Sequence, residues 1–182
     1  MRRAAVKAKE PPDIAVARRV LDTEIVGLEA LAAALDSSFA DAVDKLATIT
    51  GRVTVTGMGK SGHIARKIAS TLASIGTPAQ FVHPAEASHG DLGMLAAGDA
   101  VLALSNSGET SELADILAYA RRFALPVIAI TAREDSALAE SADVTLRLPA
   151  AAEACSMGLA PTTSTTMMMV LGDALAVALF ER

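Results

Sequence analysis

Apolar residues near the start of the chain recur every three or four positions, the spacing that places side chains on one face of an α-helix. Seven apolar positions between residues 13 and 35 keep this spacing and predict one long amphipathic helix: Ile14, Val20, Leu21, Ile25, Leu28, Leu31 and Leu35. A second amphipathic stretch predicts a helix over residues 37–49, with Ser37 or Ser38 as its N-cap. The chain therefore begins with two predicted helices.

The pattern then changes to short, continuous apolar runs rich in β-branched residues, which are typical of buried strands. Five such runs occupy residues 52–57, 79–82, 100–105, 126–131 and 144–149. Segments with helical character lie between most of them, at residues 61–75, 110–123 and 136–141. Strands that alternate with helices predict a parallel sheet with helices on both faces, an α/β fold.

The last apolar segment, from Met167 to Phe180, has almost no polar position. A helix that is apolar around its whole circumference must be buried, either within its own chain or in an interface between chains. No segment reaches the roughly 18 apolar residues of a membrane span without a charge. We therefore expect this final helix to be a core or interface helix.

Composition narrows the class of protein further. The 182 residues are 52% hydrophobic and 20% charged, which suffices for one well-buried domain. A net charge of −5 without a long basic run leaves no electrostatic footprint for a nucleic-acid backbone. Cys155 is the only cysteine, and the basic start of the chain runs into Pro and Asp instead of a signal-peptide core. We expect a soluble, cytoplasmic protein without a nucleic-acid or membrane partner.

The first predicted strand is followed by "GMGKSGH", which contains the glycine pattern G-x-G-x-x-G. A dinucleotide site needs an acidic residue near the end of the second strand, and neither Asp nor Glu stands there. A Walker A loop needs a glycine at position 54, which is a threonine. What is left is a loop that places Lys60 and Ser61 at a helix N-terminus, where one anionic group can bind.

The loop after the third predicted strand, "SNSGETSE", concentrates small polar side chains. The hydroxyls of Ser105, Ser107 and Thr110 can surround a phosphate together with the free N–H groups of the following helical turn. Asn106 adds a side-chain amide. The alternative is that Ser107 or Thr110 only caps the helix. Four polar side chains in one loop favour a phosphomonoester site.

Three longer stretches carry a family resemblance: "GMGKSGHIARKIASTLASIGTPAQFVHPAEASHGDLGML", "LSNSGETSEL" and "AAEACSMGLAPTTSTTMMMVLGDALAVAL". They resemble the sugar isomerase (SIS) domain family, and within it the arabinose 5-phosphate isomerases. The resemblance covers residues 13–182, after a tail of residues 1–12 that we expect to be flexible. It implies a three-layer α/β/α sandwich with a five-stranded parallel sheet, assembled as a homodimer or homotetramer.

The resemblance also implies a reaction. Members of this family interconvert D-ribulose 5-phosphate and D-arabinose 5-phosphate through an enediol or enediolate, which feeds 3-deoxy-D-manno-octulosonate and lipopolysaccharide synthesis. The implied substrate is a pentose phosphate, and no cofactor is implied. Carried over by motif, the essential side chains are Lys60, His89, Glu112 and Glu153. The implied phosphate ligands are Ser105, Ser107 and Thr110, with Ser61 nearby.

The proposed chemistry needs a base, a group that stabilises the sugar oxygens and an anchor for the phosphate. Lys60 can stabilise an oxyanion or the phosphate, and His89 can help to open the ring or carry a proton. Glu153 follows an apolar stretch, so we expect burial to raise its pKa, whereas Glu112 lies at a helix start that favours the charged form. Glu153 is therefore the expected base, and Glu112 is expected to orient the sugar or the lysine.

The other two histidines have weaker functional interpretations. His63 is expected to pack or cap, because it lies one turn into the first crossover helix. His83 and His89 match no zinc motif, so we expect them to hold a divalent metal only adventitiously.

Two alternatives to the pentose phosphate isomerase are another SIS isomerase, acting on a hexulose or heptulose phosphate, and a non-catalytic sugar-phosphate sensor. The stretch "HPAEASHGDLGML" favours the pentose phosphate reaction. Longer members of the family continue beyond the position of Arg182 into a segment with a further active-site histidine and then into paired CBS domains. The sequence is compatible with a piece of such a protein and with a short natural form.

Overall fold

The structure is a computed structural model that describes residues 11–182. The tail expected over residues 1–12 lies outside the described residues except for Pro11 and Pro12. The strands are β1 (Val53–Gly57), β2 (Ala79–Phe81), β3 (Ala100–Leu104), β4 (Val127–Thr131) and β5 (Val144–Arg147). The helices are α1 (Pro12–Ala34), α2 (Ser37–Ala47), α3 (Gly59–Ser74), α4 (Pro84–Ala87), α5 (Ala114–Arg122), α6 (Ala137–Glu140) and α7 (Thr163–Phe180). Two short 3-10 helices are η1 (Asp91–Met94) and η2 (Ser111–Leu113).

The five strands form one parallel sheet in the order β2-β1-β3-β4-β5. Every predicted strand is confirmed to within two residues at each end. Successive residues of the central strand β3 enter different cores, as the two-residue period of a strand requires. Leu102 and Leu104 join the core on one face of the sheet, and Val101 and Ala103 join the core on the other.

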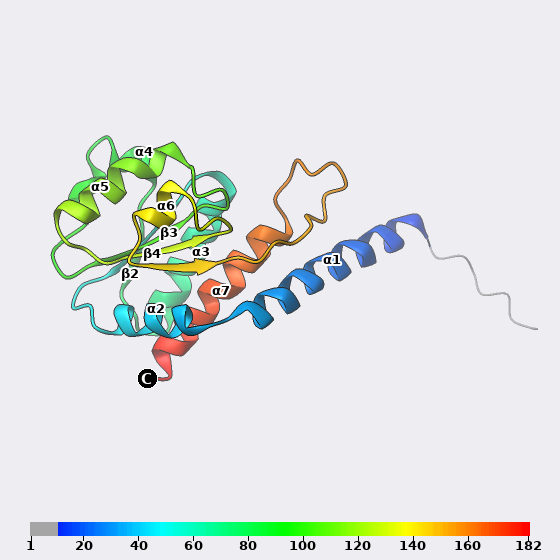
Figure 1. Cartoon of the computed structure of the whole chain (residues 1–182), viewed down its shortest axis with the longest axis horizontal. Coiled ribbons are helices and arrows are strands. Elements are labelled where there is room, and N and C mark those ends of the chain that lie inside the picture. The colour runs from blue at the N-terminus through cyan, green and yellow to red at the C-terminus, as the bar shows by residue number, and fades with distance from the viewer. Residues whose placement is uncertain (1–10) are drawn as a thin grey trace, which may run out of the picture.

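Helices cover both faces of the sheet (Figure 1). The core on one face includes side chains of α2, α3 and α7 and the end of α1, whereas the core on the other includes side chains of α4, α5 and α6. This arrangement confirms the predicted α/β/α sandwich. Because both faces are buried, the strands are continuous apolar runs in the sequence instead of alternating ones.

Two local predictions differ from the structure. The N-cap of α2 is Asp36, whose carboxylate accepts a hydrogen bond from the N–H of Ser38 at 2.8 Å, so neither Ser37 nor Ser38 is the cap. The aspartate precedes the serines by one residue and competes for the same free N–H groups. The segment after β2, expected as a loop, instead contains the short helices α4 and η1.

Helix α7 is buried along one side only. Met168, Leu171 and Leu175 enter the core, and Gly172 allows a close approach to α3, because a Cβ there would collide with Ile68. Val177 and Phe180 stay exposed at 47% and 67%. By length and composition alone α7 could cross a membrane, yet its apolar side packs against α3 and Asp173 pairs with Lys67. The expectation of complete burial is therefore not met within one chain.

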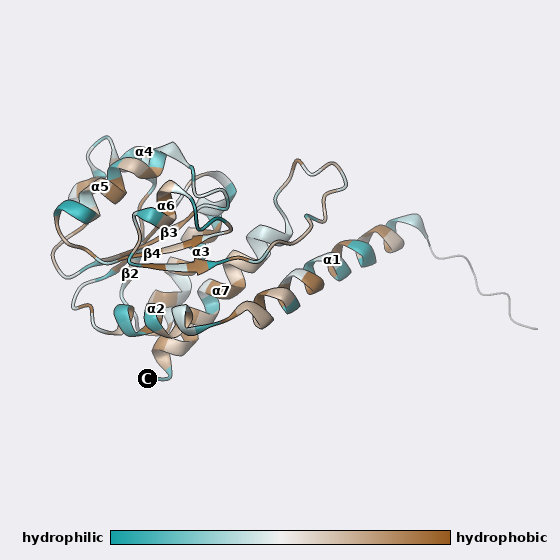
Figure 2. Cartoon of the chain, viewed as in Figure 1, coloured by the Kyte–Doolittle hydropathy of each residue, from teal (hydrophilic) through white to brown (hydrophobic). Residues whose placement is uncertain are grey.

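Helix α1 is the least buried long element of the described chain. Its first half projects away from the sheet and its covering helices (Figure 1). Ile14, Leu21 and Ile25, which the sequence places on the apolar face, are 47–59% exposed, and Figure 2 shows apolar residues along the projecting half. The buried residues of α1, Gly27 and Leu31, both lie in its second half. The amphipathic pattern of α1 is thus largely unpartnered in a single chain.

Candidate active site

The candidate site lies at the carboxyl ends of β1 and β3, the central pair of neighbouring strands. After β1 the chain crosses toward β2, and after β3 it crosses toward β4, so the two connections leave the sheet in opposite directions. Such a switch point leaves a crevice in which open α/β sheets bind ligands. Gly57 at the end of β1 is directly opposite Leu104 at the end of β3. The two loops with predicted anion-binding residues therefore begin side by side.

The loop after β3, residues 105–110, brings its hydroxyls together. The Oγ of Ser105 is 2.8 Å from Oγ1 of Thr110 and 3.5 Å from Oγ of Ser107. The N–H of Gly108 donates to Ser105 Oγ at 3.0 Å, and the N–H of Glu109 donates to Ser107 Oγ at 3.2 Å. Ser105 is buried, whereas Ser107 faces solvent. The loop is thus a compact cup of hydroxyl and amide groups, which we call the hydroxyl loop.

Helix capping does not account for this cluster. Thr110 directly precedes η2, but no side chain caps that helix, and the Thr110 hydroxyl instead contacts Ser105. The Ser107 hydroxyl accepts from the N–H of Glu109 two residues on, a local turn contact, and its other contact is the long one with Ser105. Asn106 is exposed at the rim of the loop. The hydroxyls are therefore gathered without a structural helix cap that would explain all of them.

Lys60 and Ser61 lie in the first turn of α3, next to the hydroxyl loop in the order of the sheet. No side chain caps this turn, so its N–H groups are open to an anion. Lys60 is exposed and makes no hydrogen bond or ion pair within residues 11–182. Gly59 has a φ of +58°, the left-handed conformation that lets the chain turn sharply into the helix. His63, one turn further on, is exposed, and no side chain caps the start of α3, so neither the packing nor the capping role expected of His63 is seen.

The two remaining histidines follow β2. His89 is exposed in the turn between α4 and η1, and its backbone N–H donates to the backbone carbonyl of Glu86 at 3.0 Å. His83 is half-buried at the start of α4, with its ring edge-on to Phe81, and its Nδ1 is buried without a partner. Within the described residues, no three His, Cys, Asp or Glu side chains are placed to hold a metal ion.

Glu112 lies in η2, two residues beyond the hydroxyl loop. Its Oε2 accepts a hydrogen bond from the Ser111 hydroxyl at 3.1 Å, and the side chain is exposed. In residues 11–182, no hydrogen bond or ion pair joins Lys60, His89, Glu112 and Glu153 to one another. The structure therefore places Lys60 and Glu112 on loops at neighbouring strand ends without direct contact between them.

Glu153 caps the N-terminus of α7. Its Oε2 accepts from the N–H of Thr162 at 2.6 Å, from the Thr162 hydroxyl at 3.0 Å and from the N–H of Ser164 at 3.5 Å. Burial alone would raise the pKa of Glu153, but the hydrogen bonds from Ser164 and Thr162 outweigh it and hold the pKa below its ordinary value. The expectation of a raised pKa is wrong, because the carboxylate meets the polar start of α7 and not the alanines that precede it.

The loop around Glu153 is tied to α1. Arg19 of α1 donates from Nη1 to the carbonyl of Ala154 at 3.0 Å, and the N–H of Ala154 donates to the Thr162 hydroxyl at 2.9 Å. Gly27 of α1 lies so close to α7 that a Cβ would collide with Thr163. Sequence reasoning missed these positions, because they act through the packing of segments that are distant along the chain.

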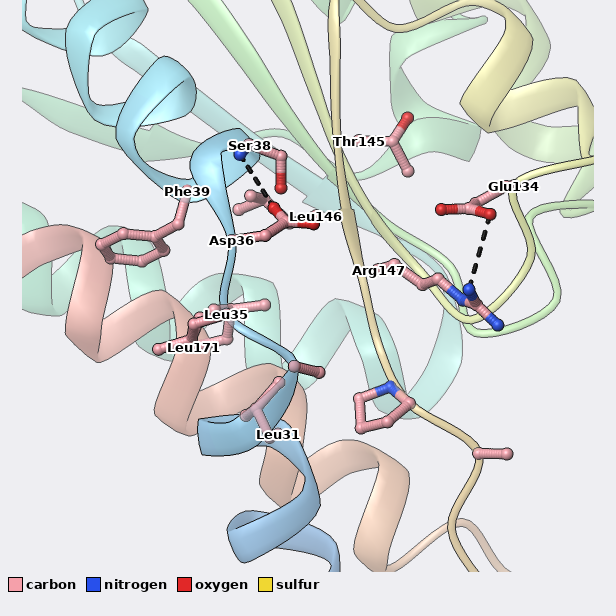
Figure 3. Close-up of a pocket in the computed structure, with 13 residues that line it drawn as sticks. Leu31, Leu35, Asp36, Ser38, Phe39, Glu134, Thr145, Leu146, Arg147 and Leu171 are labelled. Atoms are coloured by element: carbon pink, nitrogen blue, oxygen red, sulfur yellow. Dashed lines mark hydrogen bonds and ion pairs between the residues drawn. The ribbon is translucent and has the colours of Figure 1, made fainter.

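A cavity of about 370 Å³ lies apart from the candidate residues, between the α1–α2 connection, β5 and α7. Figure 3 shows its apolar floor, formed by Leu31, Leu146 and Leu171 among others, and its rim, where Arg147 pairs with Glu134 at 3.6 Å. None of the candidate site residues lines it. The candidate residues instead lie on loops and helix starts that follow the strands, and they range from buried, as Ser105 is, to exposed, as Lys60 and Glu112 are.

Comparison with protein families gives one family match. The SIS domain model matches residues 46–178. Among curated proteins, the chain is 51% identical over 164 residues to arabinose 5-phosphate isomerase KdsD of Salmonella typhi, covering 90% of this chain and 50% of that protein. It is 50% identical over 165 residues to KdsD of Pseudomonas aeruginosa, covering 91% and 51%. The chain thus spans about half the length of these relatives.

Solved structures give a similar result. The structure of E. coli CFT073 c3406 in complex with A5P has a TM-score of 0.91 and 41% sequence identity, covering 96% of this chain and 93% of that chain. Phosphoheptose isomerase GmhA from Neisseria gonorrhoeae has a TM-score of 0.75 at 18% identity, covering 94% and 100%, a likeness of fold alone.

Proposed function

Because the chain belongs to the SIS domain family, we propose that it is an aldose–ketose isomerase that interconverts D-arabinose 5-phosphate and D-ribulose 5-phosphate. The observation that carries this proposal is the cup of three hydroxyls at the switch point of the sheet, beside an uncapped helix start with a lysine. The likeness to c3406 with A5P and to the two KdsD proteins supports the choice of a pentose phosphate.

In this proposal the hydroxyl loop holds the phosphate. The hydroxyls of Ser105, Ser107 and Thr110 and the loop amides contact the phosphate oxygens, and the Asn106 amide adds a donor at the rim. Ser61 and the first-turn N–H groups of α3 approach from β1, with Lys60 supplying the positive charge. The phosphate thereby anchors the sugar between the ends of β1 and β3.

The chemistry moves a proton between C1 and C2 through an enediolate. Lys60 stabilises the negative oxygen, and His89 moves a proton to or between the sugar oxygens. We assign proton abstraction to Glu112, which is exposed beside the hydroxyl loop. Glu153 is assigned to holding its loop against α7, since its hydrogen bonds and lowered pKa do not suit a base at neutral pH. This reverses the roles expected from the sequence.

A homodimer or homotetramer is part of the proposal. The projecting half of α1 exposes Ile25 at 51%, and the tip of the loop after β5 exposes Met157 and Leu159 at 74% and 75%. Apolar side chains gathered on a projecting helix and on a loop tip are costly in water, and a second copy would cover them. Because α1 is hydrogen-bonded to the Glu153 loop, assembly would also steady that loop. We place the protein in the cytoplasm, which its lone cysteine supports.

To test this function, D-ribulose 5-phosphate is incubated with the protein and the sugars are followed by NMR. We expect D-arabinose 5-phosphate to form until the two sugars reach equilibrium, and a Ser107→Ala protein to convert more slowly at low substrate. Fructose 6-phosphate and sedoheptulose 7-phosphate serve as comparison substrates. Conversion of either of these at a higher rate than the pentose phosphate, or no conversion of any sugar, would contradict the proposed reaction.

A further inference from the structure

The hydroxyl loop packs against residues 131–138, which run from the last residue of β4 into the first turn of α6. We call these residues the β4–α6 segment. The carbonyl of Asn106 accepts from the N–H of Ala132 at 3.1 Å and from the Thr131 hydroxyl at 3.4 Å. The carbonyl of Gly108 accepts from the N–H of Leu138 at 3.0 Å. Two alternate carbonyls of the loop, those of Asn106 and Gly108, are therefore hydrogen-bonded to the same neighbouring segment.

These bonds determine where the loop amides point. In a trans peptide the C=O and the following N–H point in opposite directions, and the described chain has no cis peptide. With the carbonyls of Asn106 and Gly108 directed at the β4–α6 segment, the N–H groups of Ser107 and Glu109 are directed away from it. The N–H of Glu109 indeed reaches the Ser107 hydroxyl at 3.2 Å, on the side of the hydroxyl cluster. Two amide donors therefore face the same side as the hydroxyls.

The contact between loop and segment is close. Gly108 has a φ of +69°, and a Cβ there would collide with the Ser136 side chain and lie 3.0 Å from Oγ1 of Thr131. Both hydroxyl residues are buried, Thr131 at 0% and Ser136 at 1% exposure. Each is held by further bonds: Thr131 Oγ1 accepts from the N–H of Arg133 at 3.2 Å, and Ser136 Oγ donates to the Arg133 carbonyl at 2.7 Å. Thr131 and Ser136 therefore pack against Gly108, and their own hydrogen bonds keep them in place.

We propose that Thr131 and Ser136 are positioning residues for phosphate binding, which hold the carbonyl of Asn106 and the backbone at Gly108 so that the loop amides face the phosphate. Neither side chain belongs to the phosphate ligands themselves. The inference rests on the proposed function, since the ligand is the phosphate group of the sugar. It extends the site from the hydroxyl loop to a neighbouring strand end.

The test uses Thr131→Val, which keeps shape but removes the hydroxyl, and Thr131→Ser, which keeps the hydroxyl. The affinity for D-arabinose 5-phosphate is measured by calorimetry, and KM and kcat by the NMR assay. We expect Thr131→Val to weaken binding and raise KM about tenfold, the effect of about one lost polar contact. The change in kcat should stay within about twofold, because an interaction made equally in ground and transition states affects KM. Thr131→Ser should restore the parent affinity.

Thr54→Val is the matched control. Thr54 is also a fully buried strand threonine with a hydrogen-bonded hydroxyl, which accepts from Gln80 Nε2 at 3.2 Å, but it lies near the start of β1. Because Thr54 makes one such contact and Thr131 makes two, Thr54→Val should lower the melting temperature no more than Thr131→Val does, and it should leave affinity unchanged. Ser136→Ala should weaken binding by a smaller factor, about threefold, since the bond lost is one step further from the loop.

The outcomes separate the inference from the proposed function. Parent affinity in Thr131→Val, or equal losses in Thr131→Val and Thr131→Ser, would overturn the positioning role. A parent protein that binds D-arabinose 5-phosphate without converting it would contradict the proposed reaction and leave the Thr131 binding test valid. A parent protein that does not bind the sugar at all would contradict both proposals.

Discussion

The hydroxyl loop and the Glu153 loop both follow strands of the same sheet, yet they are supported in different ways. The hydroxyl loop is held from within the domain, by hydrogen bonds from the β4–α6 segment and by the close packing of Gly108. The Glu153 loop is hydrogen-bonded to Arg19 of α1, a helix whose first half projects away from the sheet (Figure 1). Met157 and Leu159 of this loop are largely exposed.

In the proposed function, this difference separates substrate binding from the chemical step. If the hydroxyl loop is the phosphate site, we expect it to bind the phosphate in a single chain, because its donors are already oriented by the domain itself. The Glu153 loop is hydrogen-bonded to α7 and to the projecting helix α1, so a second copy that covered α1 would steady this loop further. We therefore expect changes near the hydroxyl loop to affect affinity, and changes near α1 or the glutamates to affect turnover.

Replacement of Glu112, the proposed base, should have the largest effect on turnover. Replacing Glu112 with Gln keeps the shape of the side chain and removes its basicity, so turnover should fall by about 10²–10⁴-fold with little change in sugar binding. Exchange of the substrate C2 proton with deuterated water, followed by NMR, measures the step directly. Glu140→Gln, an exposed glutamate on α6, is the control and should exchange at the parent rate.

Glu153→Gln provides the comparison in the same exchange assay. We expect a smaller loss than for Glu112→Gln, because Gln can still accept hydrogen bonds from the start of α7. The assigned roles would be reversed if Glu153→Gln stopped the exchange while Glu112→Gln left it intact.

Preventing a second copy from packing on α1 should have the second largest effect on turnover. A charge at Ile25 should prevent a second copy from packing on the projecting helix, so Ile25→Glu should lower the assembly state and reduce turnover by about tenfold or more. Light scattering at micromolar concentration reports the assembly state. Phe123→Glu is a matched control, since Phe123 is 52% exposed against 51% for Ile25 but lies after α5. A parent protein that is a stable monomer would refute the proposed assembly.

The fold was predictable from the sequence because a buried parallel sheet produces a recognisable pattern of apolar residues along the chain. Strands covered on both faces appear as short apolar runs, and helices between them keep an amphipathic period. The location of the candidate loops follows from the same rule, since loops after parallel strands gather at one edge. The sequence alone was therefore enough to predict that Lys60 and the hydroxyl loop lie at the same edge of the sheet.

Features that depend on partners distant in sequence were not predictable. The environment of Glu153 is provided by Thr162 and Ser164, and its neighbours along the chain, mostly alanines, suggested the opposite pKa shift. The support from Thr131 and Ser136 likewise has no local signal, because both are ordinary small polar residues at a strand end and a helix cap. The sequence also could not decide whether α7 is buried within its own chain or in an interface, and in one chain its outer face, with Val177 and Phe180, stays exposed.

Removing a hydroxyl from the loop itself should weaken binding without stopping the reaction. Ser107→Ala should lower the affinity for D-arabinose 5-phosphate about tenfold, the loss of one hydrogen bond to a charged group. Calorimetry measures the change, and Ser156→Ala, an exposed serine in the Glu153 loop, is the control. Unchanged affinity in Ser107→Ala would remove the hydroxyl loop from the phosphate site.

The smallest expected effect is a change in the pH dependence of stability. Hydrogen bonds hold the pKa of Glu153 below the 4.5 of an ordinary glutamate, so the folded state favours the charged carboxylate. Its contribution to stability is therefore complete above about pH 4.5 and is lost as the pH falls through the lower folded-state pKa. At pH 7 the loss of this charged helix cap costs about 1 kcal/mol. Glu153→Gln should then lower the melting temperature by about 2–4 °C.

Thermal unfolding of the parent and of Glu153→Gln between pH 3 and pH 7 tests this prediction. The two melting temperatures should differ most at neutral pH and converge in acid, where the parent carboxylate takes up a proton and resembles the amide. Asp135→Asn is a useful contrast: the neighbouring Arg133 lowers the pKa of Asp135 through a hydrogen bond, but the pair is exposed on the surface and should contribute little. A difference for Glu153→Gln that persisted unchanged into acid would contradict this prediction, because Gln keeps the shape of Glu and both side chains are neutral there. The lower stability of the variant would then come from the amide group itself and not from the loss of the carboxylate charge.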